Sequence, residues 1–229
     1  MKNKINLSDQ VIMITGVSGQ LGQALTNEAL NSNAKVVGLD TSKDEMEKIA
    51  KKFNWNKSNI LLQQTDIRKK KEIEKALANG IDHFGKINSQ INNSGVSVYD
   101  NWSKRSEEDF DFVTDVNLKG TFFCMQVFMS HCIKSKSSGS IVNIASHYGL
   151  ISPDPRIYTD YKSRNSEVYG ATKAGVIQMT KYFSANALAD GAKIRINAVA
   201  PGGIKNPQNP QGKDFQKRYG ERCPMGRLA

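Results

Sequence analysis

The sequence has little of what marks a membrane, secreted or disulfide-stabilised protein. Its 229 residues contain no run of about 18 apolar residues, and the polar start Met1-Lys-Asn-Lys-Ile-Asn6 lacks the apolar stretch of a signal peptide. The three cysteines are odd in number and form no C-x-x-C pair, which argues against a disulfide scaffold and a zinc site. We therefore expect a soluble, cytosolic protein that binds no metal, with Cys124 in its core.

Acidic residues are outnumbered, with 22 Asp and Glu against 32 Lys and Arg, which gives a net charge of +10. Such an excess raises the hypothesis of nucleic-acid binding. The basic residues are scattered, however, and the densest cluster, Arg68–Lys71, opens a predicted surface helix. Lysine and asparagine are both abundant, so compositional bias is the simpler interpretation. We expect neither a nucleic-acid nor a membrane partner.

Strand-like and helix-like stretches alternate along the whole chain. Short apolar, β-branched runs predict strands, and longer stretches with apolar residues at helical spacing predict helices. The predicted strands are Val11–Thr15, Lys35–Asp40, Ile60–Asp66, Ser89–Gly95, Ser140–Ser146 and Ile194–Pro201. The predicted helices run from the first strand's glycine turn to about Ser32, and over Lys43–Phe53, Lys69–Phe84, Glu107–Ile133 and Glu167–Leu188. This alternation implies one α/β domain over residues 1–229, a Rossmann-type doubly wound parallel sheet flanked by helices.

The first predicted strand runs into the glycine turn Gly16-Val-Ser-Gly-Gln-Leu-Gly22, which opens a helix. Strand, glycine turn and helix N-terminus in this order form a phosphate cradle. The missing side chains let a pyrophosphate reach backbone N–H groups, and the helix dipole favours the anion. The cofactor-binding candidates in this turn are Gly16, Ser18, Gly19, Gln20, Leu21 and Gly22.

Two further strand ends bear on the choice of cofactor. Asp40 ends the second predicted strand, 18 residues after Gly22. An acid at this place accepts the adenosine ribose hydroxyls and repels a 2′-phosphate, so NAD is favoured over NADP; the alternative is a solvated strand-end acid. Asp66 ends the third predicted strand and Ile67 follows it, and both are candidates to border the adenine ring.

Tyr169 and Lys173 lie four residues apart in the last long predicted helix, so both side chains can point into one site. A phenol titrates near ~10, and a nearby ammonium favours the phenolate, so we expect Lys173 to lower the pKa of Tyr169. Ser146 ends the preceding predicted strand, where a serine can hydrogen-bond a substrate carbonyl or hydroxyl. Each feature alone has an ordinary structural interpretation: Y-x-x-x-K occurs by chance on helices, and serines cap strands.

Taken in order, these motifs resemble the short-chain dehydrogenase/reductase family over nearly the whole chain. The glycine turn, Asn92-Asn-Ser-Gly95 and Pro201-Gly202 look like the family's cofactor elements, which adds the cofactor-binding candidates Asn93, Ser94, Gly95, Tyr169, Lys173, Pro201, Gly202 and Ile204. Asn117, Ser146, Tyr169 and Lys173 fall where the family's catalytic set falls. The resemblance implies that Tyr169 is the acid/base and that Lys173 lowers its pKa and holds the nicotinamide ribose. It also implies that Ser146 orients the reacting oxygen and that Asn117 supports a water-mediated proton relay.

Three features depart from the family pattern. The glycine spacing is G-x-x-G-x-x-G, as in the family's longer, sugar-nucleotide-using branch, and Gln20 stands where the shorter branch usually has glycine. The stretch from Ser146 to Tyr169 is longer than usual. The chain also stops at Ala229, where relatives continue through a helix and a final strand. We therefore expect the sixth strand to be an exposed apolar edge (Ile194, Ile196, Ala198, Val199), with a loop-like, polar Lys205–Ala229. We also expect the chain to be a fragment of a longer product or prone to misassembly.

The long insert is the clearest pointer to a substrate. It carries candidate substrate residues Arg156, Tyr158 and Arg164, together with Lys162 and Tyr161. Arginine suits phosphate or carboxylate groups and tyrosine suits sugar faces, although a solvated loop is an equal alternative. The insert, followed by Pro-Gly-Gly-Ile (201–204), resembles a subgroup associated with flagellin glycosylation and surface-polysaccharide sugar synthesis.

The leading hypothesis is therefore an NAD(H)-dependent oxidoreductase that interconverts an alcohol and a carbonyl on a sugar, sugar phosphate or nucleotide sugar. The alternatives are a reductase of a lipid or other non-sugar ketone, and a catalytically inactive protein that retains cofactor affinity. The resemblance implies a homodimer or homotetramer, which the short C-terminus makes doubtful.

Overall fold

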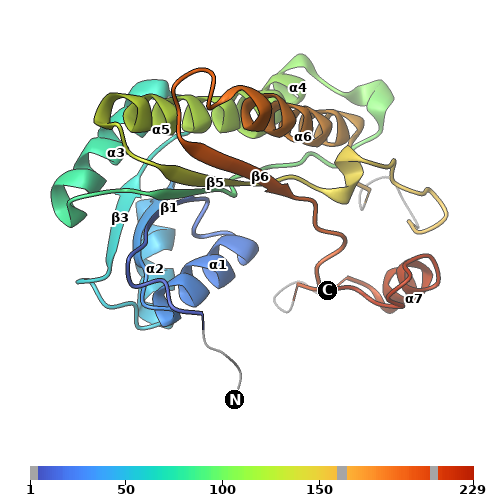
Figure 1. Ribbon diagram of the computed structural model, residues 1–229. Coiled ribbons are helices and arrows are strands. Elements are labelled where there is room, and N and C mark those ends of the chain that lie inside the picture. Colours follow the sequence, from blue (N-terminus) through green and yellow to red (C-terminus); the bar gives the residue numbers. More distant parts are fainter. Residues whose placement is uncertain (1–4, 159–163, 207–210) are drawn as a thin grey trace.

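The computed structural model describes residues 5–158, 164–206 and 211–229. In this part of the chain six parallel strands form one sheet in the order β3-β2-β1-β4-β5-β6 (Figure 1). The strands are β1 (Val11–Thr15), β2 (Lys35–Asp40), β3 (Ile60–Gln64), β4 (Ser89–Asn92), β5 (Gly139–Ile144) and β6 (Ile194–Val199). The chain moves outward from β1 to β3 and then crosses to β4 on the other side of β1. The predicted doubly wound sheet is confirmed, and its topological switch lies between β1 and β4.

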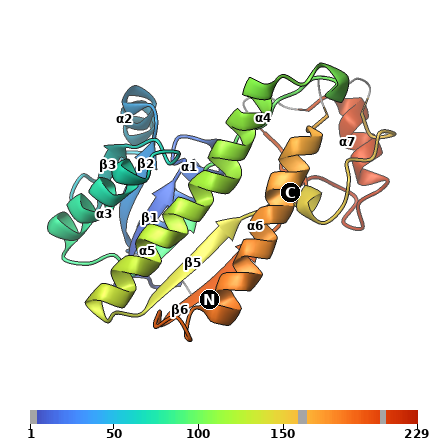
Figure 2. The same ribbon diagram turned by 90° about the horizontal axis from the view of Figure 1, so that it is seen from above.

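Helices cover both faces of this sheet. On one face lie α1 (Gln20–Asn31) and α2 (Lys43–Lys52), and on the other α3 (Lys70–Phe84), α5 (Thr121–Ser135) and α6 (Glu167–Asn186) (Figures 1 and 2). Short 3₁₀ turns, η1 (Trp102–Lys104) and η3 (His147–Gly149), stand in the loops after β4 and β5. None of the helices in the described ranges is long and apolar enough to cross a bilayer.

The apolar strands explain this layering. All five residues of β1 are buried; Met13 joins the core beneath α3 and α5, and its neighbour Ile14 joins the core beneath α1 and α2. Successive side chains of a strand point to opposite faces, so a strand covered on both sides must be apolar throughout. Cys124 is fully buried in the first of these cores, as predicted.

The long helix predicted over Glu107–Ile133 has an interruption that the sequence pattern does not reveal. It consists of α4 (Glu107–Thr114), a π-helical turn η2 (Asp115–Gly120) and α5. The wider turn shifts the following side chains around the helix axis, and such turns are frequent at functional sites. Asn117 lies in this turn and is fully buried.

The predicted loop character of Lys205–Ala229 is wrong for its described part. The helix α7 (Lys213–Gly220) forms there because Phe215 and Tyr219, four residues apart, pack with Ile157 and Leu228 in a separate apolar cluster. An eight-residue amphipathic helix is too short for the apolar spacing to stand out in the sequence.

β6 is the edge of the sheet in the described residues, as predicted. Its apolar residues are less exposed than expected, because Ile194 and Ile196 face the core beneath α5 and α6. Val199 is the exception at 51% exposure.

Candidate functional site

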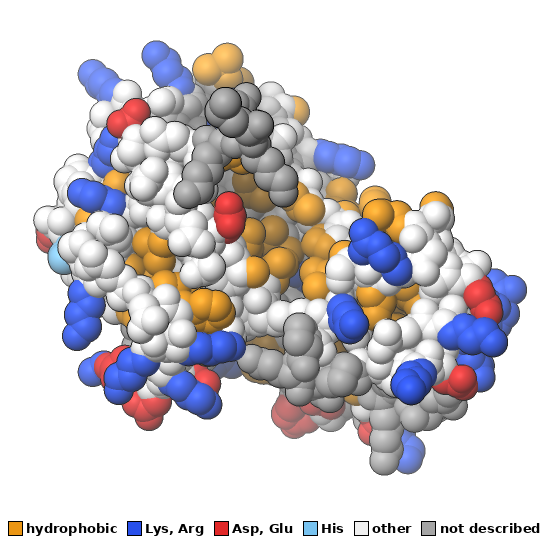
Figure 3. Space-filling model, turned by 90° about the horizontal axis from the view of Figure 1, so that it is seen from below, with side chains coloured by type: hydrophobic (Ala, Val, Ile, Leu, Met, Phe, Trp, Pro, Cys, Tyr) orange, Lys and Arg blue, Asp and Glu red, His pale blue; other side chains and the backbone are white. Residues whose placement is uncertain are grey.

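A cleft of about 1420 Å³ runs along the carboxyl ends of the strands. Its middle lies at the switch between β1 and β4, where an open α/β sheet has room for a ligand. Seen from below, hydrophobic side chains gather in a hollow at the middle of the molecule (Figure 3). Sixteen of the predicted cofactor-binding residues line this cleft: Gly16, Ser18, Gly19, Gln20, Leu21, Asp40, Asp66, Ile67, Asn93, Ser94, Gly95, Tyr169, Lys173, Pro201, Gly202 and Ile204.

The glycine turn between β1 and α1 needs glycine at two positions. Gly16 has φ +71°, and a Cβ there would lie 3.0 Å from Ser94 Cα. Gly22 is buried in the first turn of α1 rather than on the cleft, and a Cβ there would lie 1.9 Å from the Gly16 carbonyl oxygen. Gly22 therefore lets the helix pack directly on the turn.

Thr15, at the end of β1, joins this turn to the loop after β4. Its Oγ1 accepts the N–H groups of Asn93 and Ser94, both at 3.0 Å. The Asn93 amide in turn donates to the carbonyl oxygens of Thr15 and Gly16, each at 3.0 Å. Thr15 thus holds the two loops at the switch point together, a role that its sequence position did not predict.

The amino end of α1 fits an anion. Gly19 is its N-cap and provides no side-chain cap, and the first turn carries no acidic residue, so no side chain of the described residues caps the amino end of this helix. The Ser18 hydroxyl is buried and has no hydrogen-bond partner in the described residues. The Asp40 carboxylate lies beside the turn and accepts the N–H of Ser18 at 3.0 Å and that of Thr41 at 2.8 Å. These groups fit the pyrophosphate and ribose of a dinucleotide.

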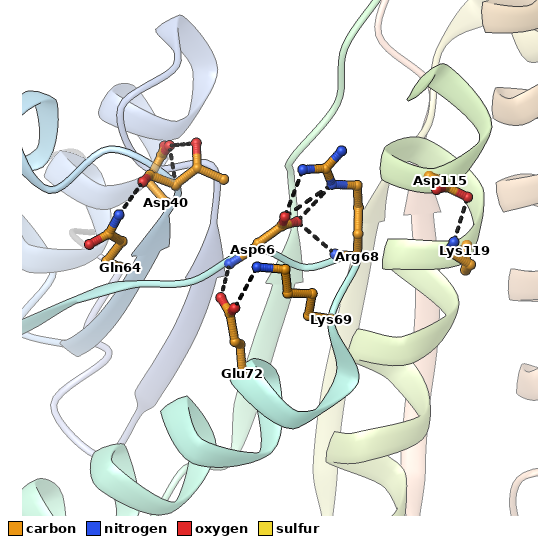
Figure 4. A network of polar contacts seen from close by, with 9 residues as sticks. Asp40, Gln64, Asp66, Arg68, Lys69, Glu72, Asp115 and Lys119 are labelled. Atoms are coloured by element: carbon orange, nitrogen blue, oxygen red, sulfur yellow. Dashed lines mark hydrogen bonds and ion pairs between the residues drawn. The ribbon is translucent and has the colours of Figure 1, made fainter. Parts of the chain in front are cut away.

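An ion-pair network borders the far end of the cleft (Figure 4). Both carboxylate oxygens of Asp66 accept from the Arg68 guanidinium at 2.7 to 3.1 Å, and this pairing lowers the pKa of Asp66. Glu72 anchors the same loop by accepting the Asp66 N–H at 2.8 Å, and it also pairs with Lys69 at 3.0 Å. Arg68 lines the cleft beside Phe112, with its guanidinium carbon 5.9 Å from the ring centre. The sequence analysis missed this arginine, although it stands two residues after Asp66.

Tyr169 and Lys173 project from the first turns of α6, whose N-cap Ser166 accepts the Tyr169 N–H at 3.3 Å. Lys173 is 4% exposed, and its Nζ donates to the Ile144 carbonyl oxygen at the end of β5 at 2.7 Å. Burial lowers the pKa of Lys173 to about 8. The same Nζ lies 3.3 Å from where a Cβ of Gly95 would stand, so Gly95 leaves room for the ammonium.

The pKa of Tyr169 moves in the direction opposite to the one expected from the sequence. Burial raises it, and a hydrogen bond with the Ser146 side chain only partly offsets that rise. The Lys173 Nζ lies 5.7 Å from the centre of the phenol ring, and burial is the largest influence on the pKa of the phenol. The phenol is therefore protonated at neutral pH in this structure.

Ser146 lies at the carboxyl end of β5, where its position in the sequence places it. It is buried, lines the cleft, and its Oγ accepts the Tyr148 N–H at 3.1 Å. Asn117 is the one predicted catalytic residue that does not reach the cleft surface in the described structure. Its amide exchanges two hydrogen bonds with the Val96 backbone, at 2.8 and 2.9 Å, and donates to Thr172 Oγ1 at 3.2 Å. The π-helical turn thus connects the loop after β4 with α6.

Of the three predicted substrate residues, the structure places Tyr158 on the cleft. Arg156 is turned away from it, with both its Nε and Nη2 bonded to the Asp154 carboxylate at 2.8 to 3.1 Å. Arg164 is half-buried and also absent from the cleft lining, although its charge acts on Tyr158 and Glu167. Tyr161 and Lys162 lie outside the described residues.

The end of the cleft beside Tyr169 contains residues that the sequence analysis did not select. They come from the loops after β4 and β5, the insert, and the segment around α7: Tyr99, His147, Tyr148, Asn165, Gln211, Asp214, Phe215 and Tyr219. The Tyr219 hydroxyl accepts the Gly203 N–H at 2.7 Å, which fixes the loop after β6. The i,i+4 pair Phe215 and Tyr219 was the available signal, but its cluster forms only through tertiary contacts.

Comparisons with known proteins agree with this geometry. Residues 10–216 match the family described as short chain dehydrogenase. The 3-oxoacyl-[acyl-carrier-protein] reductase FabG of Thermotoga maritima is 31% identical over 225 residues, which cover 98% of this chain and 86% of that protein.

Two solved structures extend the comparison. A short chain dehydrogenase from Leptospira borgpetersenii serovar Hardjo-bovis with bound NAD+ has a TM-score of 0.85 at 32% identity, covering 98% of this chain and 83% of that one. ElxO with NADP bound has a TM-score of 0.81 at 27% identity, covering 96% of this chain and 86% of that one. Both cofactors thus occur among similar structures. The chain belongs to the short-chain dehydrogenase/reductase family and is an oxidoreductase enzyme.

Proposed function

We propose that the protein is an NAD(H)-dependent oxidoreductase that interconverts an alcohol and a carbonyl on a small, sugar-type metabolite. The observation that carries this proposal is that Ser146, Tyr169 and Lys173 meet on the same cleft as the uncapped amino end of α1. A dinucleotide that lies with its pyrophosphate on α1 spans the cleft toward these three residues. When bound, the nicotinamide supplies or accepts the hydride.

The roles of the chain's own residues follow from their positions. In reduction the Tyr169 hydroxyl donates its proton to the substrate oxygen as a hydride reaches the carbonyl carbon, and in oxidation both transfers reverse. Ser146 hydrogen-bonds the same substrate oxygen and holds it toward Tyr169. The Lys173 ammonium binds the nicotinamide ribose and stabilises the phenolate left by proton transfer. Asn117 holds the loop after β4 and α6 together, and through water it connects Lys173 to solvent.

The position of Asp40 leads us to expect that NADH binds at least tenfold more tightly than NADPH. A 2′-phosphate on the ribose would meet the Asp40 carboxylate, and tenfold requires only ~1.4 kcal/mol. The nearby cation, Arg68, is already paired with Asp66. Fluorescence titration with both cofactors tests this, with Asp40→Asn expected to narrow the ratio and Asp44→Asn, on the exposed side of α2, as the control. Equal affinities for NADH and NADPH in the unmodified protein would show that Asp40 does not discriminate against the 2′-phosphate.

The substrate class is supported more weakly than the reaction. The similar proteins include FabG and oxidoreductases of general description, whose names do not indicate surface-glycan synthesis. A sugar-type substrate draws support from the tyrosines of the cleft and from the G-x-x-G-x-x-G spacing. The similarity to FabG favours a second candidate, reduction of a 3-oxoacyl or other non-sugar ketone. We further propose that the protein acts in the cytoplasm as a homodimer or homotetramer.

The test is NADH binding measured alongside turnover with a panel of sugars, sugar phosphates, nucleotide sugars and 3-oxoacyl thioesters. We expect NADH to bind and at least one sugar-type compound to be turned over. Turnover of 3-oxoacyl thioesters alone would replace the leading candidate with the second. Binding of NADH without turnover across the panel would favour a catalytically inactive cofactor-binding protein.

A further inference from the structure

The end of the cleft next to Tyr169 is walled by aromatic side chains from three separate segments. Tyr148 comes from η3, Tyr158 from the insert, and Phe215 and Tyr219 from α7; all four line the cleft. The Tyr158 and Phe215 ring centres are 5.4 Å apart, and those of Phe215 and Tyr219 are 5.9 Å apart at an interplanar angle of 28°. Such a wall offers flat apolar faces to a ring-shaped ligand.

Two phenol hydroxyls form the polar feature of this wall. Tyr148 and Tyr158 hydrogen-bond to each other through their hydroxyl groups. Burial raises the pKa of both phenols, so both are neutral at physiological pH. In such a pair one hydroxyl donates to the other, so the accepting hydroxyl keeps its own hydrogen to donate to a ligand. The Tyr219 hydroxyl instead accepts a hydrogen bond from the Gly203 N–H.

Charge at this end disfavours an anion. Among the described lining residues around the aromatic wall, the charged side chain is an acid, Asp214; Lys173 belongs to the catalytic set farther in. Arg156 and Arg222 pair with Asp154, which lies outside the lining, and Arg218 pairs with Asp214 at 3.2 Å. Arg164 also lies outside the lining, although its charge acts on Tyr158. A phosphate bound here would lie near the Asp214 carboxylate, and the like charges would repel each other.

We propose that this end of the cleft selects an uncharged, ring-shaped substrate, a neutral sugar or cyclic polyol, over its phosphorylated counterpart. The Tyr148–Tyr158 hydroxyl pair binds a ring hydroxyl, and the aromatic faces pack on the ring. The proposal rests on the proposed function for the chemistry that follows binding, but it concerns binding itself.

The test measures binding by saturation-transfer NMR on the NADH-saturated protein with two matched pairs, D-glucose with D-glucose 6-phosphate and myo-inositol with its 1-phosphate. We expect a neutral member to bind at least about tenfold more tightly than its phosphate. Tyr158→Phe removes only the hydroxyl and should weaken neutral-ring binding at least about fivefold. Asp214→Asn should reduce the discrimination against phosphate to about threefold or less. Tyr182→Phe, on the exposed side of α6, should change nothing.

Tighter binding of a phosphate, absence of binding by both neutral rings, or full binding by the Tyr158→Phe variant would each overturn the proposal. NMR detects binding without turnover, so failure of the selectivity proposal can be distinguished from failure of the proposed function. A protein that binds neutral rings but transfers no hydride would disprove the oxidoreductase assignment to this substrate class and leave the selectivity standing. Turnover restricted to phosphorylated sugars would disprove the selectivity and leave the oxidoreductase assignment standing.

Discussion

Tyr169→Phe is expected to lower kcat by about 10³-fold or more while NADH affinity stays within about twofold. The substitution removes one oxygen atom, and general acid–base catalysis by a positioned side chain contributes typically ~10²–10⁴-fold. The ring keeps its place because α6 is held by the Ser166 cap and by packing that the hydroxyl does not share. NADH consumption with any substrate found in the panel measures kcat, and fluorescence titration measures NADH affinity.

Two variants on the same helix separate catalysis from folding. Tyr182 is 58% exposed and lies outside the cleft lining, so Tyr182→Phe should leave both quantities unchanged. Lys173→Ala should damage both, because Lys173 is placed to bind the ribose and to stabilise the phenolate. Substantial turnover by the Tyr169→Phe variant would overturn the role proposed for this phenol.

The pKa shifts of Tyr169 and Lys173 come mainly from burial. Burial raises the pKa of Tyr169 and lowers the pKa of Lys173 to about 8, so it favours the uncharged form of each group. Their spacing of four residues in the sequence predicted an ammonium close to the phenol and therefore a lowered pKa for Tyr169. The net shift could not be predicted, because desolvation depends on how closely Gly95 and η3 pack against Lys173. A protonated Tyr169 at neutral pH is the form that carbonyl reduction requires.

The features that the sequence predicted well depend on short stretches of neighbouring residues. Buried parallel strands such as β1 are apolar on both faces, so their positions follow from short runs of residues. The glycine turn is predictable because Gly16 and Gly22 meet steric conditions that only glycine satisfies. The order of the motifs along the chain then predicts that Ser146, Tyr169 and Lys173 share one site, and all three line the cleft.

The features that were missed depend on contacts between distant segments. The π-helical turn that buries Asn117 has no signature in a run of residues that reads as helix throughout. α7 folds because Phe215 and Tyr219 pack in one cluster with Ile157, which lies more than fifty positions earlier in the chain. Arg156 is the exception, since Asp154 stands only two residues away and a local ion pair was a foreseeable competitor for its charge.

The second large effect is expected at Gly22, which lets α1 begin directly on the phosphate turn. A Cβ at this position would lie 1.9 Å from the Gly16 carbonyl oxygen and 2.9 Å from the Val17 Cα, distances that real structures do not contain. Because both contacts are with backbone, Gly22→Ala must push the amino end of α1 away from the turn. Overpacking of this kind costs typically ~1–3 kcal/mol, so we expect the melting temperature to fall by about 5–10 °C.

The same displacement moves the first N–H groups of α1 away from the place where a pyrophosphate would lie, so NADH affinity should fall about 100-fold or more. Gly19→Ala is the matched control within the turn, because its Cβ would make an ordinary 3.4 Å contact with the same Gly16 oxygen and its φ is −70°. Differential scanning calorimetry should therefore show a near-normal melting temperature for Gly19→Ala and a lowered one for Gly22→Ala. A Gly22→Ala protein with unchanged stability and NADH affinity would mean that the turn relaxes without cost, and that the close approach of helix and strand does not hold the cofactor site.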